Sequence, residues 1–357
     1  MSKARKRVAI IGSHGIYASY GGWDQLVNNL AERRSEDVEY LIFNSRESPR
    51  SIQPPPGVTV RRLPFSAAGF EGLFFDFYSV LLSLWRVDVV LLLGVQGIPL
   101  LAALRWLWPV RIVSNVGGVE WERPHLGQAA RLYLRFCFDL ALRFSSHVVL
   151  DNPHYRIYLP QKHRANVVTI PYGGVIDTSL RVSEEMLKKF PFLDGPYFLA
   201  VGRSIADNRL RELCEAFSAS QHRLVLISNL SRSAYGRAIF ADFSNRPGLT
   251  LIDGLYDKPE LDLIRRRCTA YVHTHTLCGT APSLVEMIVA RRPILSADVP
   301  QNRYTLDGQG FFFSDYAELI NLLDQKFIEL PRWTPTAAVR ERYNWAGIVN
   351  RYEGLYR

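Results

Sequence analysis

The strongest constraint on the fold is an alternation, along nearly the whole chain, of short apolar runs with segments of helical periodicity. The runs are rich in Val, Ile and Leu and end in Gly, Asn or Ser, which is typical of buried strands joined by helices in parallel sheets. In the first half they are 8–12, 39–43, 87–94, 111–116, 148–152 and 167–172, and in the second half 197–202, 224–228, 249–254, 270–275, 293–297 and 310–313. The pattern predicts an α/β chain with two Rossmann-like domains facing across a cleft.

Length and local composition predict where the domains divide. A chain of 357 residues exceeds one ordinary core and suits two domains. Between the two sets of strands lies a polar stretch with Pro191 and Gly195, which we interpret as a linker. Near the end, Trp345, Ile348 and Tyr352 share one helical stripe. The expected parts are an N-terminal domain (1–175), a linker (176–196), a C-terminal domain (197–340) and a final helical segment (341–357).

Composition excludes some classes of protein. Apolar residues make up 48% of the chain and charged residues 22%, which indicates a globular protein. The net charge of +9 favours anionic partners, whereas the aromatic-flanked basic motifs of RNA-binding sheets are missing, so we expect no nucleic acid. The four cysteines form no disulfide pattern, and charges interrupt the apolar region 70–107. We therefore expect a cytoplasmic protein, with a peripheral position on the inner face of the cell membrane left open.

A glycine-containing loop follows the first strand and leads into a helix. Gly21 and Gly22 stand directly before the apolar positions of that helix. Glycine lets backbone N–H groups approach phosphate oxygens, and a helix N-terminus favours anions. A tight structural turn explains the pair equally well, so both interpretations stay open.

A second strand-to-helix junction, residues 271–287, carries the more specific pattern. Pro282 suits the first turn of a helix, which would leave the N–H groups of Ser283 and Leu284 free for a diphosphate. Glu286 falls one turn into that helix and could reach a ribose hydroxyl. The alternative is a first-turn glutamate favoured by the helix dipole.

His273 and His275 lie two residues apart and would share one face of a strand. A metal site would need a third ligand, and Cys278 is the one nearby residue placed to supply it. We expect no metal, and interpret a histidine of this loop as a contact to sugar or phosphate.

Two further segments follow strand ends. Arg203 and Arg209 could both face a diphosphate, although two solvated surface arginines are the simpler explanation. Glu120, Trp121 and Arg123 could line a sugar site, or Trp121 could be a packed loop anchor. The basic helix 131–143 has two interpretations: a solvated polar face over a core stripe, or a surface that meets anionic lipid head groups.

Taken together, these segments resemble the family-four retaining glycosyltransferases of GT-B fold, and most of all the bacterial branch of polysaccharide rhamnosyltransferases. The match spans nearly the whole chain in the same order. It comprises Gly12–Asp24, Asn115–Trp121, Asp151-Asn152, Tyr172-Gly173-Gly174, Gly202-Arg203 and His273–Met287. The segment 345–356 resembles the helix that crosses back to the first domain in this fold. Three departures stand out: Gly117 where the branch has Asp, Cys278 where many relatives have a glutamate, and Ala281 where Asn is usual.

The resemblance implies a role for each group of residues. The N-terminal domain would be the acceptor side and the C-terminal domain would bind the nucleotide sugar, with no metal and no cofactor. Arg203, Arg209 and Glu286 would be the catalytic residues. The donor would contact Gly21, Gly22, His273, Gly279, Thr280, Ser283, Leu284 and Glu286, and the acceptor Trp23, Asp24, Glu120 and Trp121.

The activity implied by the resemblance is retaining, metal-independent transfer of a hexose or 6-deoxyhexose, with dTDP-L-rhamnose as the best single donor. The acceptor would be a lipid-linked saccharide at an anionic membrane surface, during capsule, exopolysaccharide or O-antigen synthesis. Two alternatives stay open: a GT-B epimerase or hydrolase of the nucleotide sugar, and a weakly active scaffold that binds a nucleotide sugar or a partner transferase.

Overall fold

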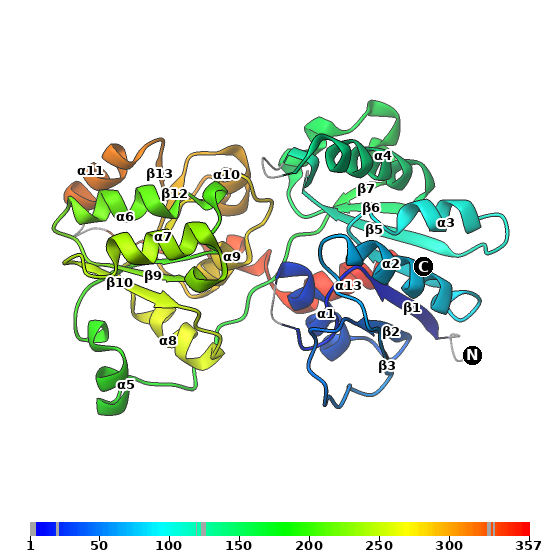
Figure 1. Cartoon of the computed structure of the whole chain (residues 1–357), viewed down its shortest axis with the longest axis horizontal. Helices are drawn as coiled ribbons and strands as arrows, with labels where there is room; N and C mark the ends of the chain where they lie inside the picture. The colour runs from blue at the N-terminus through cyan, green and yellow to red at the C-terminus, as the bar shows by residue number, and fades with distance from the viewer. Residues whose placement is uncertain (1–4, 19–20, 119, 123–125, 327–329, 331–332) are drawn as a thin grey trace. The chain divides into compact units, whose positions relative to one another are not determined.

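The computed structural model describes residues 5–18, 21–118, 120–122, 126–326, 330 and 333–357 (Figure 1). The chain forms two compact units. Unit 1 consists of Met1–Tyr172 with Trp345–Arg357, and unit 2 of Gly173–Asn344. Each unit has its own parallel sheet and its own cores, so each is described by itself.

Unit 1 is built on a seven-stranded parallel sheet of order β3-β2-β1-β4-β5-β6-β7. Its strands are β1 (Lys6–Ile11), β2 (Val38–Asn44), β3 (Val58–Arg62), β4 (Val89–Leu93), β5 (Arg111–Gly117), β6 (His147–Leu150) and β7 (Val167–Thr169). In the interior strand β1, Ile10 is in register with Ile42 of β2 and Leu91 of β4. The strand order reverses between β1 and β4, which in such sheets is where ligands bind at the carboxyl edge.

Helices cover both faces of this sheet. They are α1 (Gly22–Arg33), α2 (Glu71–Ser83), α3 (Ile98–Leu104), α4 (Gln128–Phe144) and α13 (Trp345–Gly354), with short 3-10 helices η1 (Glu120–Glu122), η2 (Pro153–Tyr158) and η3 (Gln161–Asn166). Because strand side chains alternate, Val8 and Ile10 share a core with α1 and α13, whereas Ala9 and Ile11 share one with α2, α3 and α4. The expected apolar stripe of the last helix is buried in the first of these cores.

Unit 2 is built on a six-stranded parallel sheet of order β10-β9-β8-β11-β12-β13. Its strands are β8 (Phe198–Val201), β9 (Leu224–Ser228), β10 (Leu249–Asp253), β11 (Ala270–His273), β12 (Ile294–Ala297) and β13 (Phe311–Phe313). The order reverses between β8 and β11, so the carboxyl end of β11 lies at the expected ligand position.

The helices of unit 2 also form two layers. They are α5 (Glu184–Lys189), α6 (Leu210–Ser218), α7 (Ala234–Phe243), α8 (Lys258–Arg267), α9 (Pro282–Val289), α10 (Pro300–Leu306), α11 (Tyr316–Lys326) and α12 (Ala337–Glu341), with η4 (Pro191–Asp194), η5 (Ala206–Asn208) and η6 (Leu230–Arg232). Residues of α6, α7 and α11 pack in the core that contains Phe198, and residues of α5, α8, α9 and α12 pack in the one that contains Leu199.

The structure confirms the predicted α/β class, and a strand lies in each segment that the sequence predicted to be one. Two features differ from expectation. Strand β3 was not predicted, because it is a short edge strand in which only Val58 is buried. The expected linker, residues 176–196, carries α5 and η4, and its apolar side chains Met186, Phe190 and Leu193 are buried in unit 2. Among the described residues, no helix is both long and apolar enough to span a membrane.

Candidate functional site

The carboxyl edge of the unit 2 sheet carries the junction between β11 and α9. Helix α9 begins at Pro282, as predicted from the sequence. The Leu284 N–H donates to the Ala281 carbonyl at 3.0 Å, so the first turn uses a group that we expected to be free. The Ser283 N–H makes no backbone hydrogen bond within the described residues, and it remains the N–H of this turn suited to an anion.

His273 ends β11 and is fully buried. Its Nδ1 lies 3.5 Å from the hydroxyl of Tyr271, which donates to the Val201 carbonyl at 3.1 Å. The rings of His273 and His275 lie with centroids 4.5 Å apart. Burial lowers the pKa of both imidazoles, that of His275 to about 4, so both rings are neutral at neutral pH.

Cys278 joins the two histidines. Its Sγ lies 3.9 Å from Nε2 of His273, and one ligand atom from each of the three residues lies within 4.8 Å of the others. A His-His-Cys set could hold zinc, whose ligands lie about 3.3–3.6 Å apart at ordinary bond lengths and tetrahedral angles, so the side chains would have to draw closer. The structure thus places Cys278, the third ligand that a metal site would need, beside the two histidines. The expected absence of metal stays a prediction.

The loop after β8 packs against the same junction. A Cβ atom at Gly202 would lie 2.5 Å from Nε2 of His275, so only glycine fits beside this ring. The Thr274 hydroxyl donates to the Asn208 carbonyl at 2.5 Å, which ties the two loops together. After burial, the charge of Arg203 is the second cause of the lowered pKa of His275. Two segments far apart in the sequence therefore place an exposed arginine near the loop 274–281.

Arg209 is held differently from Arg203. It adopts the left-handed conformation, with φ of 53°, directly before α6. Its guanidinium lies 5.0 Å from the centroid of the Tyr316 ring, and its Nε lies 3.8 Å from Oε1 of Glu212. These contacts fix the arginine at the surface of unit 2, and they compete with an anion for its charge.

Glu286 is buried on α9, where it forms an ion pair with Arg265 of α8. Arg265 is itself 4% exposed and donates to Oδ1 of Asp262 at 2.8 Å. A buried carboxylate is costly without a partner. Here the protein supplies one, because an ion pair with Arg265 offsets part of the cost of burying the charge.

In unit 1, the loop after β1 is held by Asp24. Gly12, with φ of 96°, lies so close to β4 that a Cβ atom would stand 2.0 Å from the Leu93 carbonyl oxygen. One carboxylate oxygen of Asp24 accepts from the His14 N–H at 3.0 Å, and the other lies 3.3 Å from Nδ1 of His14. Asp24, predicted as an acceptor contact, is 1% exposed and serves this loop. His14 was not among the predicted site residues, because only the fold places it beside Asp24.

Trp23 lies over two glycines at the carboxyl edge of the unit 1 sheet. A Cβ atom at Gly94 would stand 3.3 Å from its ring, and one at Gly117 would stand 3.4 Å from it. The indole Nε1 is buried and has no hydrogen-bond partner within the described residues. Gly21 is exposed and Gly22 opens α1, as predicted.

In the segment after β5, the contacts of Trp121 favour its interpretation as a packed loop anchor. Its ring packs against Phe138 of α4 at a centroid distance of 4.6 Å and meets Tyr158 edge-on. Glu120 lies beside it in η1 and is partly exposed. Arg123 falls outside the described residues.

The comparisons with known proteins agree on the fold. The structure is similar to sucrose-phosphate synthase from Thermosynechococcus elongatus, with a TM-score of 0.76 and 17% identity over 99% of this chain and 98% of that one. It is similar to Anabaena HepE in complex with UDP-glucose (TM-score 0.73, 12% identity, 98% and 99% covered). It is also similar to the trehalose-6-phosphate synthase OtsA (TM-score 0.76, 12% identity, 99% of both chains covered). The fold is GT-B. No family model matches the chain, and no curated protein matches it in sequence. The GT-B fold accounts for two parallel-sheet units in one chain, and at these identities the likeness reaches no further than the fold.

Proposed function

We propose that this GT-B protein is a glycosyltransferase and that unit 2 holds its nucleotide-sugar donor. The observation that carries the proposal is the convergence of Arg203, His275 and the start of α9 at the carboxyl edge of one sheet. A helix N-terminus and an arginine suit a diphosphate, and the small residues Gly279 and Thr280 leave room for it. Similar structures support the choice of ligand, since HepE was solved with UDP-glucose and an E. coli protein with UDP-2-fluoro glucose.

Glu286 would bind the donor ribose, and Arg265 would position it. The ion pair fixes the direction of the Glu286 carboxylate on α9. A carboxylate held in this way accepts hydrogen bonds from two neighbouring hydroxyls without first reorganising. We therefore assign binding to Glu286 and orientation to Arg265.

In the proposed reaction, the bond between the anomeric carbon and the donor phosphate oxygen breaks, and a bond to the acceptor hydroxyl oxygen forms on the same face of the sugar. The acceptor proton passes to the departing phosphate oxygen. Arg203 and Arg209 would neutralise the charge that develops on the diphosphate, and no protein nucleophile or metal takes part. Arg203, which is exposed and has no ion-pair partner within the described residues, is the better placed of the two.

Unit 1 would bind the acceptor. Trp23, whose indole N–H has no hydrogen-bond partner within the described residues, and the loop at Gly21 and Gly22 are its proposed contacts. Glu120 offers a carboxylate three residues after Gly117, the glycine beside the Trp23 ring. We propose a lipid-linked saccharide as acceptor and dTDP-L-rhamnose as donor, on the resemblance to the rhamnosyltransferase branch. Asp24 and Trp121 would act indirectly, by holding the loops that carry these contacts.

A surface of unit 1 suits an anionic membrane, where such an acceptor resides. One face of α2 and its flanks exposes large apolar side chains at helical spacing: Phe70, Phe74, Tyr78, Leu81 and Trp85. Phe70 is 74% exposed and Trp85 73%. Leu132 and Phe136 of α4 are exposed as well, beside Arg131 and Arg135. Exposed aromatic rings next to arginines are typical of surfaces that rest on lipid head groups.

A transfer assay tests the function. The protein is incubated with radiolabelled dTDP-L-rhamnose and a lipid-linked saccharide extract, and label is counted in the lipid phase. We expect label in lipid with the native chain and a loss of at least about tenfold with Arg203→Gln, whose side chain is exposed and whose replacement should not disturb folding. Free rhamnose formed without acceptor would indicate a hydrolase instead.

A vesicle assay tests the membrane surface. Phe70→Ser combined with Trp85→Ser should lower recovery with vesicles of phosphatidylcholine and phosphatidylglycerol. The matched control is Phe240→Ser with Tyr304→Ser, two exposed aromatics of unit 2. Equal recovery of both variants would count against the surface.

A further inference from the structure

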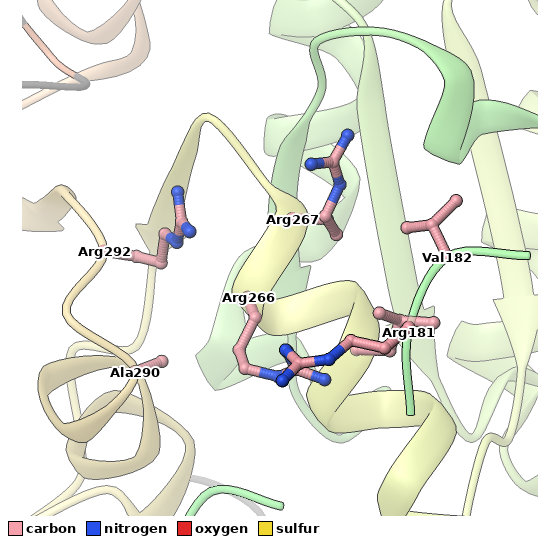
Figure 2. A pocket seen from close by; sticks show the side chains of 7 residues that line it. Arg181, Val182, Arg266, Arg267, Ala290 and Arg292 are labelled. Carbon is pink, nitrogen blue, oxygen red and sulfur yellow. The ribbon is translucent and has the colours of Figure 1, made fainter. Parts of the chain in front are cut away.

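A second concentration of positive charge lies in unit 2, in a pocket of about 440 Å³ (Figure 2). The pocket is lined by Arg181, Val182, Leu263, Arg266, Arg267, Ala290 and Arg292. Four of these residues carry a guanidinium group and the other three are apolar, so no lining residue carries a negative charge. The volume falls within the range of small-molecule sites, roughly 300–1,000 Å³.

The four arginines come from three separate segments. Arg266 and Arg267 stand at the end of α8, Arg292 follows α9, and Arg181 lies in the stretch before α5. Figure 2 shows Arg181 and Arg266 near one another and the guanidinium groups of Arg267 and Arg292 directed to the same side. The Arg266 Nη2 donates to the Leu180 carbonyl at 2.6 Å, which holds the Arg181 segment beside α8.

The described part of the chain offers these charges no counter-ion. Within the described residues, none of the four guanidinium groups forms an ion pair with a carboxylate, whereas the preceding Arg265 has two such partners. The Nε atoms of Arg266 and Arg292 are buried and have no hydrogen-bond partner there. The cluster has little influence on the pKa of the partly exposed Asp177, which is lowered first by hydrogen bonds with Ser179 and less by the charges of Lys258 and Arg266.

The helix dipole explains only part of the cluster. Basic residues are favoured in the last turn of a helix, which accounts for Arg266 and Arg267 on α8. It does not account for Arg181, which comes from an extended segment. Like charges that converge from separate segments are unfavourable unless an anion binds among them.

The pocket is separate from the proposed donor site. Arg267 precedes β11 and Arg292 precedes β12, so the pocket lies at the amino edge of the sheet. The loop 274–281 follows the carboxyl end of β11, at the opposite edge. At about 3.3 Å per residue, the four residues of β11 separate the two edges by roughly 10 Å along the strand.

We propose that this arginine pocket binds a compact, multiply charged phosphate anion, such as inorganic diphosphate or the phosphomonoester of a lipid head group. A planar guanidinium group binds two phosphate oxygens at once through parallel N–H donors, and four such groups line this pocket. The lining offers no aromatic ring and no side-chain acceptor for a nucleobase, so the phosphate alone is recognised.

Isothermal titration with inorganic diphosphate tests the proposal on the full chain. Arg267→Gln should weaken binding about tenfold or more, since each charge-assisted contact contributes strongly. The matched control, Arg246→Gln, removes one exposed charge of unit 2 away from the pocket and should bind like the native chain. Because the proposed donor site also suits a diphosphate, the titration is repeated in the Arg203→Gln background, where adding Arg267→Gln should still weaken binding about tenfold; this separates this proposal from the proposed function.

Vesicles distinguish the two sources of phosphate. Vesicles of phosphatidylcholine with phosphatidic acid should retain the native chain better than Arg267→Gln if the anion is a lipid, and equally if it is a free phosphate. Arg292→Gln serves as a second variant in both assays. The proposal is overturned if Arg267→Gln and Arg292→Gln match the Arg246→Gln control with both diphosphate and vesicles.

Discussion

The carboxylate of Glu286 forms an ion pair with the guanidinium of Arg265, and both side chains are buried in unit 2. A residue proposed to bind the donor therefore also neutralises a charge within the core. Its replacement acts on stability and on binding at once.

Glu286→Ala should lower the free energy of unfolding of unit 2 by about 3 kcal/mol, because it leaves the Arg265 charge with Asp262 as its one remaining partner among the described residues. Glu286→Gln keeps the shape and a hydrogen-bond acceptor, so it should cost less stability while still weakening donor binding. Urea unfolding and donor titration on both variants separate the two effects. Full donor affinity in a folded Glu286→Gln protein would remove Glu286 from the proposed site.

Gly117→Ala should destabilise unit 1 by about 1–2 kcal/mol, because a residue with a side chain is disfavoured at its φ of 59°. The new Cβ would also stand 3.4 Å from the Trp23 ring. Gly347→Ala is the control: nothing lies within 4 Å of that position in α13, and alanine should stabilise a helix by up to about 1 kcal/mol. Equal unfolding midpoints for the two variants would show that Gly117 has no special role.

His14 should give unit 1 a stability that declines with rising pH. The hydrogen bond to Asp24 raises the pKa of His14, and burial only partly opposes it. A raised folded pKa stabilises the protein below the unfolded value, near 6.5, and this contribution is lost as the pH rises through the folded value. Urea unfolding at pH 6 and pH 8.5 should show a loss of about 0.5–1 kcal/mol that is absent in His14→Gln. The same loss of stability between pH 6 and pH 8.5 in His14→Gln would show that His14 does not cause it.

Purified protein should contain less than ~0.1 zinc per chain, and EDTA should not change transfer, because the proposed chemistry needs no metal. Mass-spectrometric metal analysis provides the test. The cluster of His273, His275 and Cys278 makes the outcome informative, since one zinc per chain that is lost in Cys278→Ser would contradict the expectation.

The sequence predicts the sheets well because central strands of parallel sheets are buried on both faces, and so Val89–Leu93 is apolar throughout. It fails at the edge strand β3, where the burial of Val58 alone leaves little pattern. The site residues likewise divide into those predicted from local patterns and those that depend on long-range contacts. The start of α9 at Pro282 follows from local signals, whereas the Glu286–Arg265 pair joins two helices.

The other features that the sequence left unpredicted share a physical reason. The contact of His14 with Asp24 and the arginine pocket depend on segments that only the fold brings together. A local pattern predicts which residues can bind an anion, but the long-range contacts decide which of them are already paired.

The proposed function requires the folded chain to bind a nucleotide sugar, and a thermal-shift screen against UDP-, dTDP- and GDP-sugars measures this binding. A ligand that binds only the folded state stabilises it by about 2.7 kcal/mol at one hundred times its Kd. For a unit of this size we expect one nucleotide series to raise the Tm by about 5–10 °C, and Arg203→Gln to reduce that shift. No shift with any nucleotide sugar at millimolar concentration would contradict the account.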